Sequence, residues 1–161
     1  TYAAEKLAPF RDDPWLLGHF SDNELPFRAN TLDNFLKLPA TDPGGGAARA
    51  WLAARTGSAS AAPSEEDRSA FLEHVVDRYY RIVSTAIRRH APNHLYLGSR
   101  VHGSALRQRA VWVAAGRHAD VVSANIYGMW TPDASLLRAW TEWSGRPFLV
   151  TEWYVKGMDS G

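Results

Sequence analysis

Two glutamates, Glu24 and Glu152, each stand where an apolar run of the sequence gives way to polar residues. They are distant in the chain, but parallel strands would bring both to one edge of a sheet. Two carboxyl groups at such an edge can cleave a glycosidic bond, because one acid protonates the departing oxygen while the other carboxylate attacks or activates water. A single strand-end glutamate is most simply a solvated loop residue. Two of them, with aromatic residues beside them, favour a catalytic pair.

Other polar and aromatic side chains are expected near the same edge. Asn23 can donate to a sugar hydroxyl, although an isolated asparagine here can equally be a turn residue that bonds its own backbone. Tyr127 can donate to the Glu152 carboxylate and keep it ionised, or it can pack on the neighbouring strand. The remaining candidates for substrate binding are Arg100, His102, Asn125, Trp130, Trp153 and Tyr154. For Arg100 and His102, simple ion pairing is an equal alternative.

Apolar runs and helical periodicity alternate along the chain. The helix with the clearest pattern begins at Ser64, where Asp67 completes a capping box, and ends before Pro92. Region 25–63 is the least regular part, with a short helix from Thr31 and an Ala-rich helix after a break at Pro43–Gly46. Two further helices are expected around residues 106–114 and 136–140. The expected strands are 15–20, 95–98, 121–127 and 148–153.

The order strand, helix, strand predicts parallel strands with crossover helices, an α/β fold. A doubly wound sheet would carry a Gly-rich phosphate turn after its first strand, and Gly44–Gly46 follow no strand and lack the Lys-Ser/Thr of a P-loop. A (β/α)8 barrel instead places functional residues at the carboxyl ends of several strands. The positions of Glu24, Arg100, Tyr127 and Glu152 fit that pattern. We therefore predict part of a (β/α)8 TIM barrel.

Three short motifs carry a family resemblance. Asp22-Asn23-Glu24-Leu25, Asn125-Ile126-Tyr127 and Thr151-Glu152-Trp153 follow one another on successive predicted strands. Together with His94–Arg100 they resemble strands four to seven of the clan A glycoside hydrolases, and most closely the β-agarases and their β-galactosidase-like relatives. The resemblance covers essentially the whole chain. Asn125 departs from the pattern, because many clan members carry histidine at that position.

The resemblance implies a function and a set of roles. Glu24 would be the general acid/base and Glu152 the nucleophile of a retaining glycosidase that acts on a β-linked, galactose-containing polysaccharide or oligosaccharide without a cofactor or metal. The negative charge of Glu152 would keep Glu24 protonated until it donates its proton. Residues 1–161 would be one partial catalytic domain, with 25–63 as an irregular insertion and the remainder of the barrel outside this chain. Secretion or a periplasmic location would be in keeping with that family.

Composition bounds the alternatives. The net charge of +1 gives no reason to expect nucleic acid or an anionic membrane as partner, and the chain has no cysteine. Seven Trp and six Tyr suit sugar stacking but are also ordinary core residues. Of the tryptophans, Trp15, Trp112 and Trp140 are expected to pack in the core or on helices. Three rivals stay open: a barrel that binds carbohydrate without cleaving it, a glycosidase for β-glucan or β-mannan, and an aldolase-like barrel. The last would need a strand-end Schiff-base lysine, which no predicted strand has.

Overall fold

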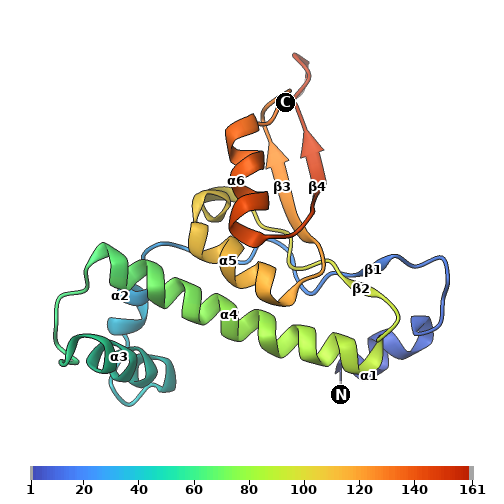
Figure 1. The fold of residues 1–161 in the computed structure, drawn as a ribbon. Helices are drawn as coiled ribbons and strands as arrows, with labels where there is room; N and C mark the ends of the chain where they lie inside the picture. Colours follow the sequence, from blue (N-terminus) through green and yellow to red (C-terminus); the bar gives the residue numbers. More distant parts are fainter. Residues whose placement is uncertain (1, 160–161) are drawn as a thin grey trace.

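Four parallel strands form the centre of the computed structural model, which describes residues 2–159 (Figure 1). They are β1 (Gly18–His19), β2 (Leu95–Tyr96), β3 (Val122–Tyr127) and β4 (Phe148–Tyr154). β1 pairs with β2 and β3 pairs with β4, in parallel register throughout. Parallel bridges Asn23–Arg100 and Val101–Ala124 connect the two pairs. The strands therefore follow one another in chain order, as the α/β prediction requires.

Helices occupy the connections between these strands. Between β1 and β2 lie α2 (Thr31–Leu36), α3 (Pro43–Thr56) and α4 (Glu65–His90). A 3₁₀ turn (Gly103–Arg107) and α5 (Arg109–His118) precede β3, and α6 (Ala134–Ser144) precedes β4. The amino-terminal α1 (Tyr2–Leu7) and a 3₁₀ turn (Ala8–Phe10) come before β1. The fold is thus mixed α/β, and no helix among residues 2–159 is long and apolar enough to cross a membrane.

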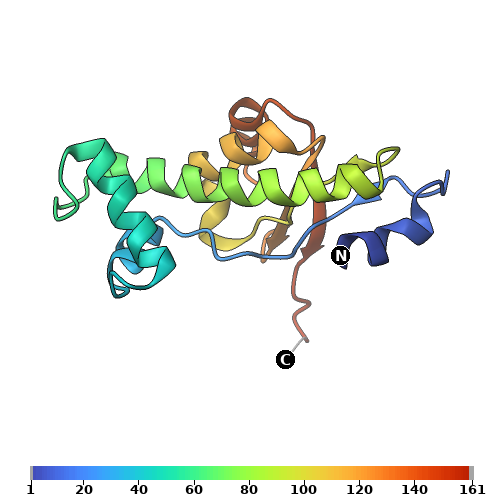
Figure 2. The same ribbon diagram turned by 90° about the horizontal axis from the view of Figure 1, so that it is seen from below.

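The long helix α4 is the main support of the strands. Its start is the predicted capping box: the Asp67 amide donates to Ser64 Oγ, and the Ser64 amide donates back to the Asp67 carboxylate. Its apolar face buries Leu72, Val76 and Tyr80 against the core. α2 and α3 lie at one end of α4 and α1 lies at the other (Figure 1). Seen from below, α5 and α6 appear on one side of α4, and the extended segment after β1 appears on the other (Figure 2).

Region 25–63 is more regular than predicted. The three glycines do not break the chain; they lie in the first turn of α3, which begins at Pro43. Asp42 explains this, because its carboxylate accepts from the amides of Gly44 and Gly45 and so satisfies two donors at the helix start. α2 and α3 then pack on Phe71 of α4 through Leu32 and Leu52.

Two of the tryptophans assigned to the core are there. Trp112 and Trp140 stack with ring centroids 4.8 Å apart, and both indole N–H groups donate to the Leu106 carbonyl. The expectation that Trp15 packs in the core was wrong, since it is 94% exposed. The predicted strand from residue 15 is also shorter, because pairing with β2 is confined to Gly18 and His19.

A β-bulge interrupts the pairing of β3 with β4. Ala124 pairs with Val150 but the next residue, Asn125, pairs with Glu152, so Thr151 has no counterpart. The Thr151 hydroxyl instead donates to the Ala124 carbonyl and to Asn125 Oδ1. Since side chains alternate between the two faces of a strand, one extra residue reverses the faces beyond it.

Candidate functional site

The segment that carries Glu24 is held against β2 and α4. The Glu24 amide donates to the Arg100 carbonyl at 2.9 Å. Upstream, Ser21 Oγ lies 2.8 Å from the hydroxyls of both Tyr79 and Tyr96. Glu24 itself has φ of 56°, and it is the only non-glycine with positive φ among residues 2–159. Backbone in this region costs on the order of 1–3 kcal/mol and persists only where the surroundings enforce it. The fold therefore fixes the direction of this carboxylate.

The bulge sets the direction of Glu152. In an uninterrupted ladder Thr151 would lie opposite Asn125, and Glu152 would turn to the other face with Ile126. Ile126 is buried, so that face points into the core. With the bulge, Glu152 lies on the same face as Asn125 and Tyr127. The carboxylate thus reaches the edge where Glu24 lies.

One hydroxyl connects the two carboxylates. Tyr127 Oη lies 3.3 Å from Glu24 Oε1 and is also hydrogen-bonded to Glu152 Oε2. Because the bond to Glu152 is no longer than the ordinary O–H···O limit of about 3.0 Å, these two carboxylate oxygens lie no more than about 6.3 Å apart. Both side chains are about one-third exposed. The structure thus brings the two predicted catalytic residues together, partly open to solvent.

Arg100 and His102 each serve one carboxylate. Arg100 Nη1 donates to Glu152 Oε1 at 2.9 Å, and His102 Nδ1 lies 3.6 Å from Glu24 Oε2. The two residues are two positions apart in an extended segment, which points both side chains to the same face. The alternatives for these residues were substrate binding and ion pairing, and the structure shows ion pairing with the two glutamates.

Asn125 and Asn23 complete the hydrogen-bonded group. The fully buried Asn125 amide donates at 3.0 Å both to Glu24 Oε1 and to Asn23 Oδ1. Asn23 takes part in this bond through its oxygen, so the N–H groups of its amide are not used in it. Thr151, which was not predicted as a site residue, holds the Asn125 oxygen. Its position beside Glu152 in the Thr-Glu-Trp motif was a signal that could have found it.

The electrostatics of Glu24 differ from the prediction. We expected the negative Glu152 to keep Glu24 protonated. Instead, the Asn125 hydrogen bond is the largest influence and holds the pKa of Glu24 below its ordinary value, assisted by the charge of His102. The free site therefore favours an ionised Glu24. Tyr127 has its pKa raised, chiefly because it donates to Glu152, so its hydroxyl keeps its proton.

The three aromatic residues predicted to bind substrate lie at the carboxyl ends of two strands. Trp130 follows β3, and Trp153 and Tyr154 end β4. Trp130 is 77% exposed, and its ring lies 6.2 Å from that of the half-exposed Trp153, whose indole donates to the Met129 carbonyl. Tyr154 is also half-exposed and contacts the ring of Tyr127 at 5.2 Å. All three rings are available to a ligand at this edge.

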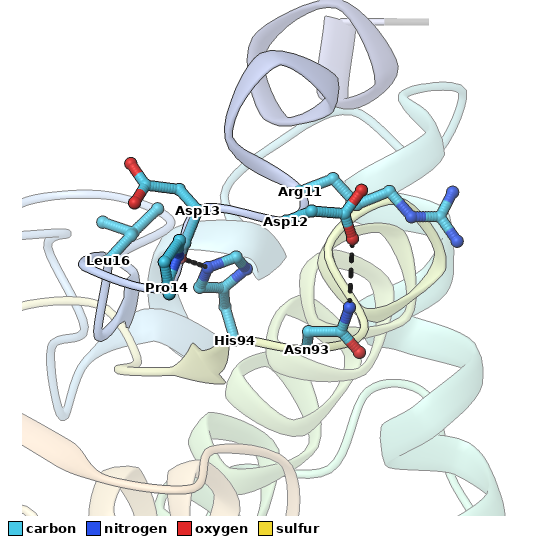
Figure 3. A pocket seen from close by; sticks show the side chains of 7 residues that line it. All are labelled: Arg11, Asp12, Asp13, Pro14, Leu16, Asn93 and His94. Atoms are coloured by element: carbon cyan, nitrogen blue, oxygen red, sulfur yellow. Dashed lines mark hydrogen bonds between the residues drawn. The ribbon is translucent and has the colours of Figure 1, made fainter.

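A separate hollow lies at the amino ends of β1 and β2 (Figure 3). It is lined by Arg11–Pro14, Leu16, Asn93 and His94. The ring of the buried His94 donates from Nε2 to the Asp13 carbonyl at 2.9 Å, and its Nδ1 has no hydrogen-bond partner among residues 2–159. None of the predicted site residues lines this hollow. No cluster of metal-binding side chains occurs within the part of the chain that the structure describes.

The chain is similar in sequence and in fold to several known proteins. No family model matches the chain. β-Agarase A of Vibrio sp. (strain JT0107) is 36% identical over 90 residues, which is 52% of this chain and 9% of that protein. The crystal structure of BpGH50 superposes with a TM-score of 0.85 at 34% identity, covering 98% of this chain and 37% of that one. An exo-β-agarase structure gives a TM-score of 0.78 at 25% identity, covering 99% of this chain and 26% of that one. This chain is a relative of the β-agarases.

The resemblance to β-agarases that the sequence motifs predicted is thus confirmed. The chain spans well under half the length of each of these relatives, so the similarity concerns one part of a larger β-agarase architecture. This chain contains both glutamates and every other predicted site residue.

Proposed function

We propose that this chain supplies the catalytic carboxylates of a glycoside hydrolase that acts on agarose, with Glu24 as general acid/base and Glu152 as nucleophile. The observation that carries the proposal is the shared hydroxyl of Tyr127, which joins two strand-end carboxylates. The names of the relatives, β-agarase A and an exo-β-agarase, supply the substrate class.

The contacts of the two glutamates support different roles. Glu152 accepts from Arg100 and Tyr127, two donors that orient its carboxylate for attack. Glu24 has no arginine contact and adjoins an open hollow, where a leaving group has room. In the first step, Glu24 gives its proton to the glycosidic oxygen while Glu152 attacks the anomeric carbon and forms a glycosyl ester. In the second, Glu24 takes a proton from the water that attacks that ester and releases Glu152.

The separation of the carboxylates favours retention. The upper limit of about 6.3 Å between the two oxygens bonded to Tyr127 lies just below the roughly 6.5–9.5 Å of inverting enzymes and allows the 5–5.5 Å of retaining ones. An inverting enzyme needs the wider separation because a water molecule must fit between its base and the sugar.

The finer fold assignment is also part of the proposal. The consecutive parallel order of β1 to β4 and the helices between them fit strands four to seven of a (β/α)8 barrel. Leu17, Leu149 and Val150 are between 38% and 63% exposed, which suits apolar side chains that face further strands of such a barrel. Residues 1–161 would then form one partial catalytic domain.

The experiment is to follow the anomer released by the full-length protein from agarose oligosaccharides by NMR. A β-anomer as first product supports double displacement, whereas an α-anomer would show inversion and remove the nucleophile role of Glu152. Activity confined to β-glucan or β-mannan would overturn the agarose assignment and leave the two-glutamate mechanism. Binding of agarose without any cleavage would favour the carbohydrate-binding rival.

Variants separate the roles of the two glutamates. Glu152→Gly should abolish the glycosyl ester. For the acid/base, Glu24→Gly is better than an alanine variant, because glycine adopts positive φ without strain. It should still form the ester from a substrate with a good leaving group, and added azide should then yield a β-glycosyl azide. An α-azide from Glu24→Gly would reverse the two assignments.

A further inference from the structure

A small hollow of about 160 Å³ opens beside Glu24. Its walls are the segment 24–28, which follows β1, and the segment 102–105, which follows β2. Glu152 is not part of its lining, although Glu24 and His102 are. The hollow therefore lies on the side of the acid/base that faces away from the nucleophile. In glycoside cleavage that side receives the departing half of the substrate, because the acid protonates the oxygen that leaves with it.

The hollow continues along the surface. A second one of about 300 Å³ shares Pro26 and Arg28 with the first and extends to Thr31 and Phe35 of α2. The two together form a trough that runs from Glu24 to α2, and Arg28 stands where they meet.

Arg28 is held in place through its backbone. The neighbouring Phe27 packs its ring against Tyr79 at 5.7 Å and so anchors the segment to α4. The Arg28 carbonyl accepts from both the amide and the hydroxyl of Thr31 at the start of α2. Its side chain, in contrast, is exposed.

The charge of Arg28 has no acidic partner among residues 2–159. Asp33, five residues further along the chain, is already engaged by both Arg68 donors at 2.8 and 3.0 Å. Asp22 accepts from Tyr79. The Arg28 guanidinium lies in the trough beside Glu24 and makes no ion pair with a carboxylate among residues 2–159. Its planar fork of N–H donors can therefore bind a ligand in the trough. Such a fork matches oxyanions, which accept two parallel hydrogen bonds.

The geometry points to a leaving-group subsite in this trough, in which Arg28 selects a sugar that carries an anionic substituent, namely a sulfate ester. The inference rests on the proposed function, since it needs Glu24 to be the acid. It goes beyond that function because agarose cleavage alone requires no charge on the leaving sugar.

The test compares two matched agarose-type oligosaccharides that differ only by a sulfate on the leaving sugar, together with an aryl glycoside that has no leaving sugar. The full-length protein should cleave the sulfated oligosaccharide with the higher kcat/KM. Arg28→Gln should reduce that preference by about tenfold to a hundredfold, the effect expected for losing a charge-assisted hydrogen bond. Arg28→Lys keeps the charge but loses the fork, and it should fall between the two. Arg89→Gln, which alters an exposed arginine at the far end of α4, is the matched control.

The outcomes are separable. Turnover of the aryl glycoside with equal rates on the two oligosaccharides would overturn the sulfate-selective subsite and leave the proposed function intact. A preference for sulfate that Arg28→Gln and Arg89→Gln diminish equally would also overturn the role of Arg28. No turnover of any of the three substrates would remove the proposed function, and the subsite with it.

Discussion

Replacing Tyr127 by phenylalanine tests how the two carboxylates share their protons. A tyrosine hydroxyl has one proton, so it can donate to only one of its two neighbours at a time. Both carboxylates lie within reach of this proton, with Glu24 Oε1 at 3.3 Å. Donation to Glu24 stabilises the ionised form of that group and contributes to its lowered pKa. The ionised Glu24 is the base required for the second step.

The magnitude follows from the bonds that are lost. A hydrogen bond to a charged group contributes about 1.5–3 kcal/mol, so Tyr127→Phe should lower kcat/KM by about tenfold to a hundredfold. Because ionised Glu24 loses one of its donors, its pKa should rise and the high-pH limb of the rate profile should move to higher pH, by about one unit for about 1.4 kcal/mol. The ring remains, so its contacts with His102 and Tyr154 are retained.

The assay is the pH dependence of kcat/KM on an agarose oligosaccharide. Tyr80→Phe is the control, because it removes a buried hydroxyl bonded to the Ser99 carbonyl in the core. It should reduce the free energy of unfolding by about 0.5–1.5 kcal/mol and leave the pH profile in place. A high-pH limb that stays fixed or moves downward in Tyr127→Phe would show that the hydroxyl does not donate to Glu24, and the proton arrangement argued above would be wrong.

Three further outcomes are expected. Trp130→Ala should weaken binding of long agarose chains by about tenfold in calorimetry, a loss of about 1.4 kcal/mol, and should affect a disaccharide little; an equal loss for both would show that the ring serves no separate subsite. Asp67 has its pKa lowered to about 2, chiefly by its hydrogen bonds with Ser64, so its stabilising contribution is complete above about pH 4 and is lost as the pH falls towards 2; acid unfolding of Asp67→Asn should lack this component. Gly116→Ala would place a Cβ 2.0 Å from the Ser144 carbonyl, and thermal unfolding should show a loss of about 1–3 kcal/mol.

Much of the fold could be predicted because the signals used involve residues that are close together in the sequence. The Ser64–Asp67 capping box and the apolar period of α4 need only neighbouring residues, and both are present as predicted. The start of α3 was misjudged because three successive glycines usually weaken a helix. The Asp42 side chain offsets this by capping their amides, and its effect depends on a turn that a composition argument does not include.

The candidate site could also be predicted only in part. Strand-end position was enough to bring Glu24, Tyr127 and Glu152 together, because parallel strands end at one edge. Alternation along β4 would have turned Glu152 towards the core, and the bulge at Thr151 has no clear sequence signature. The lowered pKa of Glu24 depends on the Asn125 amide, whose direction is set by a hydrogen bond from Thr151. Such effects follow from side-chain geometry between strands, which spacing in the sequence does not encode.

The unusual backbone of Glu24 implies that folding and catalysis make opposite demands on position 24. Its φ of 56° suits glycine, which adopts it without the cost of on the order of 1 kcal/mol or more that other residues carry. A library selected for thermal resistance alone should therefore accumulate glycine at this position, and the survivors should be inactive. A library selected for activity should keep glutamate and gain its stability elsewhere. The composition of position 24 after each selection would thus report which property the screen had favoured.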